Sequence, residues 1–75
     1  MEPKLGKYKH YKGAIVEVIG IAFHSETFEE MVVYIDYADD KKLGKNPMFV
    51  RPKKMFLEKI VVNGKKVPRF KYLEN

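Results

Sequence analysis

The stretch Ala14-Ile15-Val16-Glu17-Val18-Ile19-Gly20-Ile21-Ala22 decides the fold, because it has the strongest β-forming character in the chain. It is rich in β-branched residues and is interrupted only by Glu17, which predicts a strand. Gly20 stands inside this strand, where a glycine commonly marks a bulge or a sharp bend. An apolar strand that bends in this way is typical of a small barrel, in which one strand serves two sheets.

A second long strand is predicted from Met31 to Ala38, and several shorter strands are predicted in the rest of the chain. Asn63-Gly64 is a strong hairpin signal because both turn positions tolerate a positive φ. Pro68 places the returning strand at an edge. The alternation in the second strand predicts a core-facing set of Met31, Val33, Ile35 and Tyr37. The shorter strands are expected at Tyr8 to Lys12, Met48 to Arg51, Phe56 to Val62 and Lys65 to Phe70.

The predicted fold class is all-β: a small SH3-like barrel or a strongly bent antiparallel sheet of five to six short strands. With 75 residues and 45% hydrophobic residues, the chain is expected to form a single domain, 1–75, with a modest core. The polar connector from Asp39 to Pro47 is expected to be the most mobile loop. The run from Lys53 to Phe56 predicts a tight turn that lays Met55 and Phe56 over the core.

The formal net charge of +5 favours an anionic partner. Lysine and arginine are concentrated near both ends of the chain and acidic residues in the middle, so pairing of the ends would gather one basic patch. The chain has no cysteine, no apolar run of signal-peptide length and nothing near the roughly 18 apolar residues of a membrane span. We therefore expect a cytoplasmic location, no membrane association and no cofactor.

Six ordered motifs resemble a family of short bacterial domains of unknown function. In this chain they include His10-Tyr11-Lys12-Gly13, His24-Ser25-Glu26-Thr27, Val32-Val33-Tyr34, Val50-Arg51-Pro52, Met55-Phe56 and Pro68-Arg69-Phe70. The resemblance covers nearly the whole chain and implies a compact β-barrel, but it supplies no activity. One departure is Phe49, where members often carry a tryptophan, so an indole donor is lost at that position.

The polar run His24-Ser25-Glu26-Thr27 lies between two apolar runs, where small β-domains place binding groups. Its structural interpretation is a loop clamp, in which Ser25, Thr27 and Glu26 satisfy backbone donors at a strand end. A specific version pairs Glu26 with Arg51 or Arg69, since arginine suits a bidentate carboxylate contact.

Two chemical interpretations of the same residues are weaker. His10, His24 and Glu26 are potential metal ligands, but they lack a short ligand spacing. A small hydrolase would use Ser25 as nucleophile, His10 or His24 as base and Glu26 as the orienting carboxylate. Neighbouring side chains alternate in direction along a strand, and the chain has no nucleophile elbow, so we predict no catalytic residues and no metal site.

The leading hypothesis is a non-enzymatic binding module that recognises a protein or extended peptide through an aromatic, histidine and arginine face. Binding of single-stranded RNA or DNA is the alternative, because tyrosines interleaved with cations suit base stacking. A small hydrolase or metal-dependent enzyme is the third class, and the oligomeric state stays open. The candidate binding residues are Tyr8, His10, Tyr11, Lys12, His24, Ser25, Glu26, Thr27, Tyr34, Arg51 and Arg69.

Overall fold

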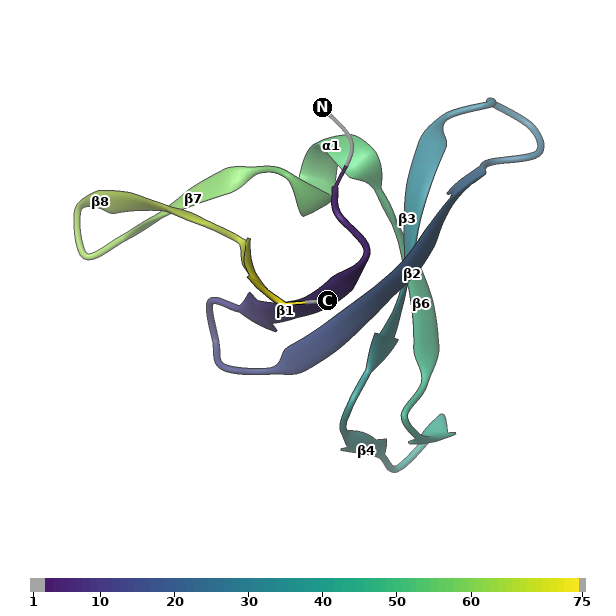
Figure 1. Cartoon of the computed structure of the whole chain (residues 1–75), viewed down its shortest axis with the longest axis horizontal. Coiled ribbons are helices and arrows are strands. Elements are labelled where there is room, and N and C mark those ends of the chain that lie inside the picture. The colour runs from purple at the N-terminus through teal and green to yellow at the C-terminus, as the bar shows by residue number, and fades with distance from the viewer. Residues whose placement is uncertain (1–2, 75) are drawn as a thin grey trace.

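The computed structural model describes residues 3–74, which form mainly antiparallel strands (Figure 1). One five-stranded sheet has the order β6-β3-β2-β1-β9. Its strands are β1 Gly6–His10, β2 Ile15–Phe23, β3 Glu30–Asp36, β6 Met48–Pro52 and β9 Phe70–Glu74. Separate hairpins pair β4 Asp39–Asp40 with β5 Gly44–Lys45 and β7 Lys59–Val62 with β8 Lys65–Pro68, and α1 Lys53–Phe56 is one helical turn. The predicted all-β class is confirmed.

Strand β2 is the centre of the sheet and bends at the predicted position. It pairs with β1 on one side and with β3 on the other. The register with β3 shifts between Val18 and Gly20, which is the signature of a β-bulge. The bulge predicted from Gly20 is therefore present in the centre of the sheet.

The bent sheet does not close into a barrel. Its outer strands, β6 and β9, are not paired with each other. Side chains bridge them instead, because the guanidinium carbon of Arg51 on β6 lies 5.4 Å from the centre of the Phe70 ring on β9. Of the two predicted architectures, the strongly bent antiparallel sheet describes this structure.

The core lies on the concave face of the sheet. Phe56 of α1 stacks on Phe70, with ring centres 4.3 Å apart and planes 6° from parallel. Tyr8 and Tyr34 pack their rings against Phe56 at 5.2 and 5.9 Å. The buried cluster consists of Tyr8, Val16, Val18, Val32, Tyr34, Phe56 and Phe70.

The predicted core face of β3 was wrong. Val32 and Tyr34 are 0% and 6% exposed, whereas the opposite face, with Met31, Val33 and Ile35, is only half-buried. Tyr37 lies beyond the strand, is exposed, and donates its hydroxyl proton to Glu17. Both faces of β3 are apolar, so alternation alone does not identify the buried one. The aromatic side chains of other elements decide it.

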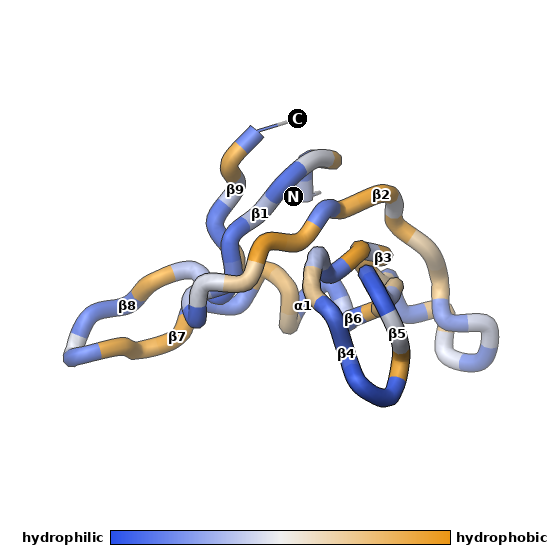
Figure 2. The backbone as a smooth tube through the Cα atoms, turned by 90° about the horizontal axis from the view of Figure 1, so that it is seen from below, coloured by the Kyte–Doolittle hydropathy of each residue, from blue (hydrophilic) through white to orange (hydrophobic). Residues whose placement is uncertain are grey.

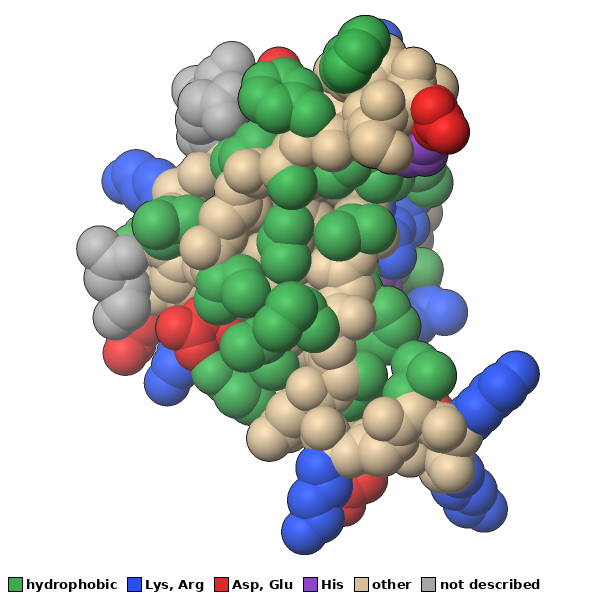
Figure 3. Space-filling model, turned by 90° about the vertical axis from the view of Figure 1, so that its right-hand side faces the viewer, with side chains coloured by type: hydrophobic (Ala, Val, Ile, Leu, Met, Phe, Trp, Pro, Cys, Tyr) green, Lys and Arg blue, Asp and Glu red, His purple; other side chains and the backbone are tan. Residues whose placement is uncertain are grey.

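Met31, Val33 and Ile35 instead belong to the outer face of the sheet. There they pair with residues of β6: Val33 lies opposite Val50, and Ile35 opposite Met48. Val50 and Met48 are both exposed. Figure 3 shows hydrophobic side chains gathered along the middle of this side of the molecule.

In two connecting segments the structure adds to or corrects what the sequence predicts. The connector after β3 contains the β4–β5 hairpin, in which one carboxylate oxygen of Asp40 accepts the backbone N–H groups of Lys42 and Leu43, both at 2.8 Å. It is hydrophilic along most of its length (Figure 2). In α1, Phe56 is buried as predicted, but Met55 points outward and is exposed.

The chain ends pair in space, as proposed from the charge distribution. Strand β9 breaks from β8 after Pro68 and pairs antiparallel with β1, placing Tyr8 opposite Tyr72 and His10 opposite Phe70. The predicted turn is present, since Asn63 and Gly64 have φ values of 51° and 79°. In residues 3–74 the helical content is the four-residue α1, far short of a membrane span.

Candidate binding site

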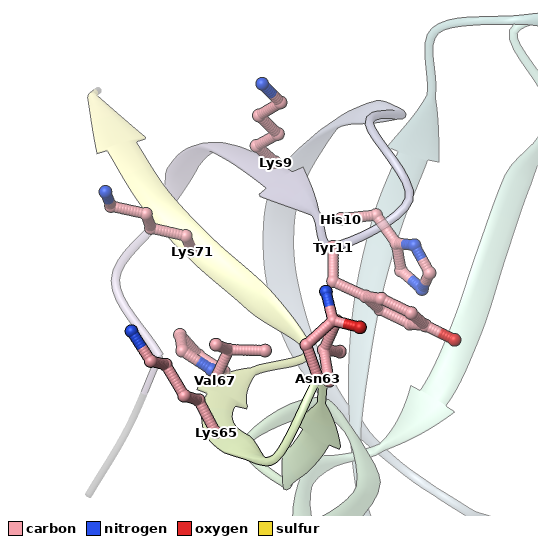
Figure 4. Close-up of a pocket in the computed structure, with 9 residues that line it drawn as sticks. Lys9, His10, Tyr11, Asn63, Lys65, Val67 and Lys71 are labelled. Atoms are coloured by element: carbon pink, nitrogen blue, oxygen red, sulfur yellow. The ribbon is translucent and has the colours of Figure 1, made fainter.

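A groove of about 650 Å³ lies between the β7–β8 hairpin and the outer face of β1 and β9. Its walls contain no acidic residue, and we call it the lysine groove. Figure 4 shows three lysine side chains along one side and His10, Tyr11 and Asn63 along the other. The residues that line it are Lys9, His10, Tyr11, Val62, Asn63, Lys65, Val67, Pro68 and Lys71.

Two of these lysines are register partners on adjacent strands. Lys9 on β1 is the register partner of Lys71 on β9, so their side chains leave the same face of the sheet. Like charges in directly opposed positions destabilise a strand pair. Lys65 adds a third positive charge from the β7–β8 hairpin. The groove therefore concentrates positive charge.

The turn after β1 sets the positions of His10 and Tyr11. The Tyr11 N–H donates to the Arg69 carbonyl at 2.9 Å, and the Lys12 N–H donates to His10 Nδ1 at 3.2 Å. The His10 and Tyr11 rings are 4.5 Å apart, and the Lys12 ammonium lies 5.7 Å from the centre of the Tyr11 ring. Tyr11 is 41% exposed, so part of its ring is open to solvent at the groove.

A smaller pocket of about 170 Å³, which we call the inner pocket, lies on the concave side of the sheet. His10 lines both pockets, so they adjoin at this residue. The inner pocket combines charged and polar groups with apolar walls. Its lining consists of His10, Ala14, Val16, Tyr34, Asp36, Arg51 and Phe70.

The surroundings of His10 favour its neutral form by lowering its pKa. Burial lowers the pKa of His10, and the positive charges of Arg51, Arg69 and Lys12 lower it further, against a smaller opposing effect of Asp36. Because Nδ1 accepts the Lys12 N–H, we assign the proton of the neutral ring to Nε2. His10 thus offers an N–H donor to the inner pocket.

Arg69 forms an ion pair with Glu58 and not, as predicted, with Glu26. Its Nη2 lies 2.7 Å from Glu58 Oε1, and its backbone N–H donates to the Glu58 carbonyl at 3.0 Å. Its own carbonyl accepts from Tyr11. Arg51 lies over Phe70, so the predicted network from Glu26 to an arginine is not formed. Arg69 instead fixes the β7–β8 hairpin against the main sheet.

The loop from His24 to Thr27 forms a clamp in which Thr27 accepts a backbone N–H as predicted, but His24 takes the place of Ser25 and Glu26 as the other acceptor. His24 Nδ1 accepts the N–H groups of Glu26 at 3.1 Å and Thr27 at 3.3 Å. Thr27 Oγ1 accepts the N–H of Glu29 at 3.2 Å. The side chains of Ser25 and Glu26 have no hydrogen-bond partner among the described residues. This exposed loop is therefore held by His24 and Thr27.

The loop is far from both pockets, because it follows the end of β2 whereas His10 precedes its start (Figure 1). Nine residues of strand separate the two positions, which corresponds to roughly 30 Å of extended chain. His10 thus does not meet His24 and Glu26 as metal ligands, or Ser25 as a catalytic base. Within residues 3–74 no cluster of three or more histidine, cysteine or acidic residues is placed to hold a metal ion.

The other predicted residues divide between the two pockets and the core. His10, Tyr34 and Arg51 meet in the inner pocket, and Tyr11 lines the groove with Lys12 beside it. Tyr8 is a core residue, 5% exposed, whose hydroxyl donates to the Lys4 carbonyl at 2.8 Å. The residues that sequence reasoning missed are Val62, Asn63, Lys65, Val67, Pro68 and Lys71 in the groove and Ala14, Val16, Asp36 and Phe70 in the inner pocket.

The fold and the two pockets define a small all-β domain with an open, strongly bent sheet. The chain belongs to the DUF1653 family, described as a protein of unknown function, whose family model matches residues 6–72. It is similar to the crystal structure of a DUF1653 protein from Bordetella bronchiseptica, with 30% sequence identity and a TM-score of 0.84 over 96% of this chain and 88% of that one. A comparison with curated proteins found no match.

Proposed function

We propose that this domain is a non-enzymatic binding module whose lysine groove takes an extended, acidic protein segment. The observation that carries the proposal is the direct opposition of Lys9 and Lys71 on the wall of an open groove that holds a third lysine, Lys65, and no carboxylate. Carboxylates of a bound segment would remove the repulsion between the two opposed lysines. Binding would then be favoured by a charge pattern that weakens the free domain.

The floor of the groove supports a peptide ligand. Val62, Val67 and Pro68 line it, and such aliphatic surfaces suit the apolar side chains of a peptide. Strand β9 is an outer strand of the main sheet, and outer strands commonly accept an added strand from an extended partner. The expected ligand therefore alternates acidic and aliphatic residues.

Single-stranded nucleic acid is the second candidate, and Tyr11 is the observation that favours it. Its exposed ring lies beside the Lys12 ammonium and near the groove lysines, which combines a stacking surface with phosphate-binding charge. Tyr11 is, however, the one tyrosine or phenylalanine among the residues lining the groove, whereas platforms of this kind stack successive bases on several rings. This difference ranks the peptide first.

The test is fluorescence anisotropy with two labelled probes, a peptide of alternating glutamate and valine and a single-stranded oligonucleotide. The double variant Lys9→Ala, Lys71→Ala should lose most of its peptide affinity. The control Lys41→Ala, Lys42→Ala removes the same charge from the β4–β5 turn and should bind like wild type. Tight binding of the oligonucleotide alone, with a steep salt dependence, would replace the peptide by nucleic acid.

A further inference from the structure

The inner pocket contains an unusual combination of unpaired polar groups. Arg51 and Asp36 both line it, yet the ion pairs among the described residues join other partners. Asp36 Oδ1 is shielded from solvent and receives no hydrogen bond from a described residue. A buried acceptor without a donor is costly, and it points to a group that the free protein does not supply.

Two donors of the pocket, Arg51 and His10, are oriented by contacts within the protein itself. The guanidinium of Arg51 lies over the Phe70 ring, a cation–π contact that limits its rotamers. Tyr34 is 6% exposed, and its hydroxyl has no hydrogen-bond partner among the described residues. His10 is oriented by the Lys12 N–H, and Figure 4 shows its ring directed away from the groove lysines.

The charge of the pocket selects the class of ligand. Arg51 and Asp36 carry opposite charges, so with a neutral His10 the lining has no net charge. An anion would meet the Asp36 carboxylate, and a cation would meet the Arg51 guanidinium. A neutral group with an acceptor beside a donor satisfies both. The volume of about 170 Å³ is below that of pockets for drug-sized molecules, so the ligand is a side chain or a fragment of similar size.

We propose that the inner pocket binds a neutral planar group in which a carbonyl oxygen stands beside an N–H, as in a primary carboxamide. The carbonyl oxygen accepts from Arg51 with His10 or Tyr34, and the N–H donates to Asp36. Apolar contact with Val16 and Phe70 excludes water from these bonds. This assignment is independent of what the lysine groove binds, since it depends on a different set of side chains apart from His10.

The test is an NMR titration of the labelled protein with propionamide and propionate, each raised to high millimolar concentration. Propionamide and propionate have nearly the same shape and differ in charge and in the N–H donor. We expect saturable shifts of the His10, Tyr34 and Asp36 resonances with propionamide. Preferential binding of propionate, or no saturable shift with any probe, would overturn the proposal.

Two variants separate recognition from folding. Asp36→Asn replaces the acceptor-only carboxylate with an amide of the same shape, and it should weaken binding of propionamide at least fivefold. The control Asp39→Asn makes the same change on exposed β4 and should bind like wild type. Should Asp36→Asn fail to fold, Arg51→Lys keeps the charge but removes the planar fork, and it should weaken binding to a similar extent. Unchanged affinity in a folded variant would contradict the assignment.

Discussion

Lys9 and Lys71 lie directly opposite each other in the antiparallel pairing of β1 and β9. Two ammonium groups on one face of adjacent strands repel, and the neighbouring Lys65 strengthens the positive potential of the groove. The fold does not need either charge for its core. We propose that the pair serves to bind an anionic partner.

A charge reversal at this pair should therefore separate stability from binding. Lys71→Glu places a carboxylate opposite Lys9 and is expected to raise the free energy of unfolding by about 0.5 kcal/mol. The same change should abolish binding of the acidic peptide. Urea denaturation and fluorescence anisotropy measure the two effects, and a variant that is less stable than wild type would contradict the repulsion.

Gly64 in the turn of the last hairpin and Gly20 in the bulge of β2 are expected to respond differently to an added Cβ. Gly64 has a φ of +79°, so Gly64→Ala is expected to lower the free energy of unfolding by about 1 kcal/mol. Gly20, at the bulge, is outside the positive-φ region, and an added Cβ would meet no atom within 4 Å. Gly20→Ala should be neutral or slightly stabilising. Equal effects of the two variants in thermal melts would count against this view of the hairpin.

The hydrogen bonds of the His24 loop predict that replacing His24 lowers the free energy of unfolding more than replacing Glu26 does. His24→Ala leaves the N–H groups of Glu26 and Thr27 without their acceptor and should cost about 1 kcal/mol. Glu26→Ala should change the free energy of unfolding by less than about 0.5 kcal/mol, because its carboxylate forms no hydrogen bond or ion pair with a residue that the structure describes. Chemical denaturation of both variants tests the ranking, which fails if Glu26→Ala is the more damaging change.

The lowered pKa of His10 predicts a pH dependence with a definite sign. Burial and the surrounding cations disfavour the protonated ring in the folded state, so the folded protein binds fewer protons than the unfolded chain below the ordinary value of 6.5. Stability is complete above that value and falls as the pH is lowered through it. The charged groups that act on His10 are Arg51, Arg69, Lys12 and Asp36.

An NMR titration of the His10 ring, assigned by comparison with His10→Gln, measures this directly. The midpoint should lie below 6.5. Thermal melts between pH 5.5 and 7.5 should show a smaller pH dependence in His10→Gln than in wild type. A midpoint at or above 6.5 would contradict the neutral histidine described here.

The sequence was sufficient for those parts of the fold that depend on local chemistry. The β-branched run of β2, its bulge at Gly20 and the turn at Asn63-Gly64 each follow from the conformational preferences of a few adjacent residues. The buried face of β3 did not follow, because both of its faces are apolar. Val32 and Tyr34 are buried because Phe56 and Phe70 pack on their side, a contact made by distant segments.

The binding surfaces were less predictable for the same reason. Lys9 and Lys71 meet only through the register of β1 with β9, which no local pattern specifies. Likewise, the sequence alone does not determine which carboxylate pairs with Arg69. Its pairing with Glu58 depends on the position of the β7–β8 hairpin. The polar run at His24 was a candidate site because its polar residues are adjacent in sequence, yet the side-chain hydrogen bonds it makes are internal to the loop.

The central claim is that the lysine groove binds an acidic, extended segment, and its most direct test is a salt titration of peptide binding. Wild type should bind the glutamate–valine peptide with an affinity that weakens as salt rises, while Lys9→Ala, Lys71→Ala should bind weakly and with a smaller salt dependence. Wild-type affinity in the double variant, or no peptide binding at low salt, would contradict the claim.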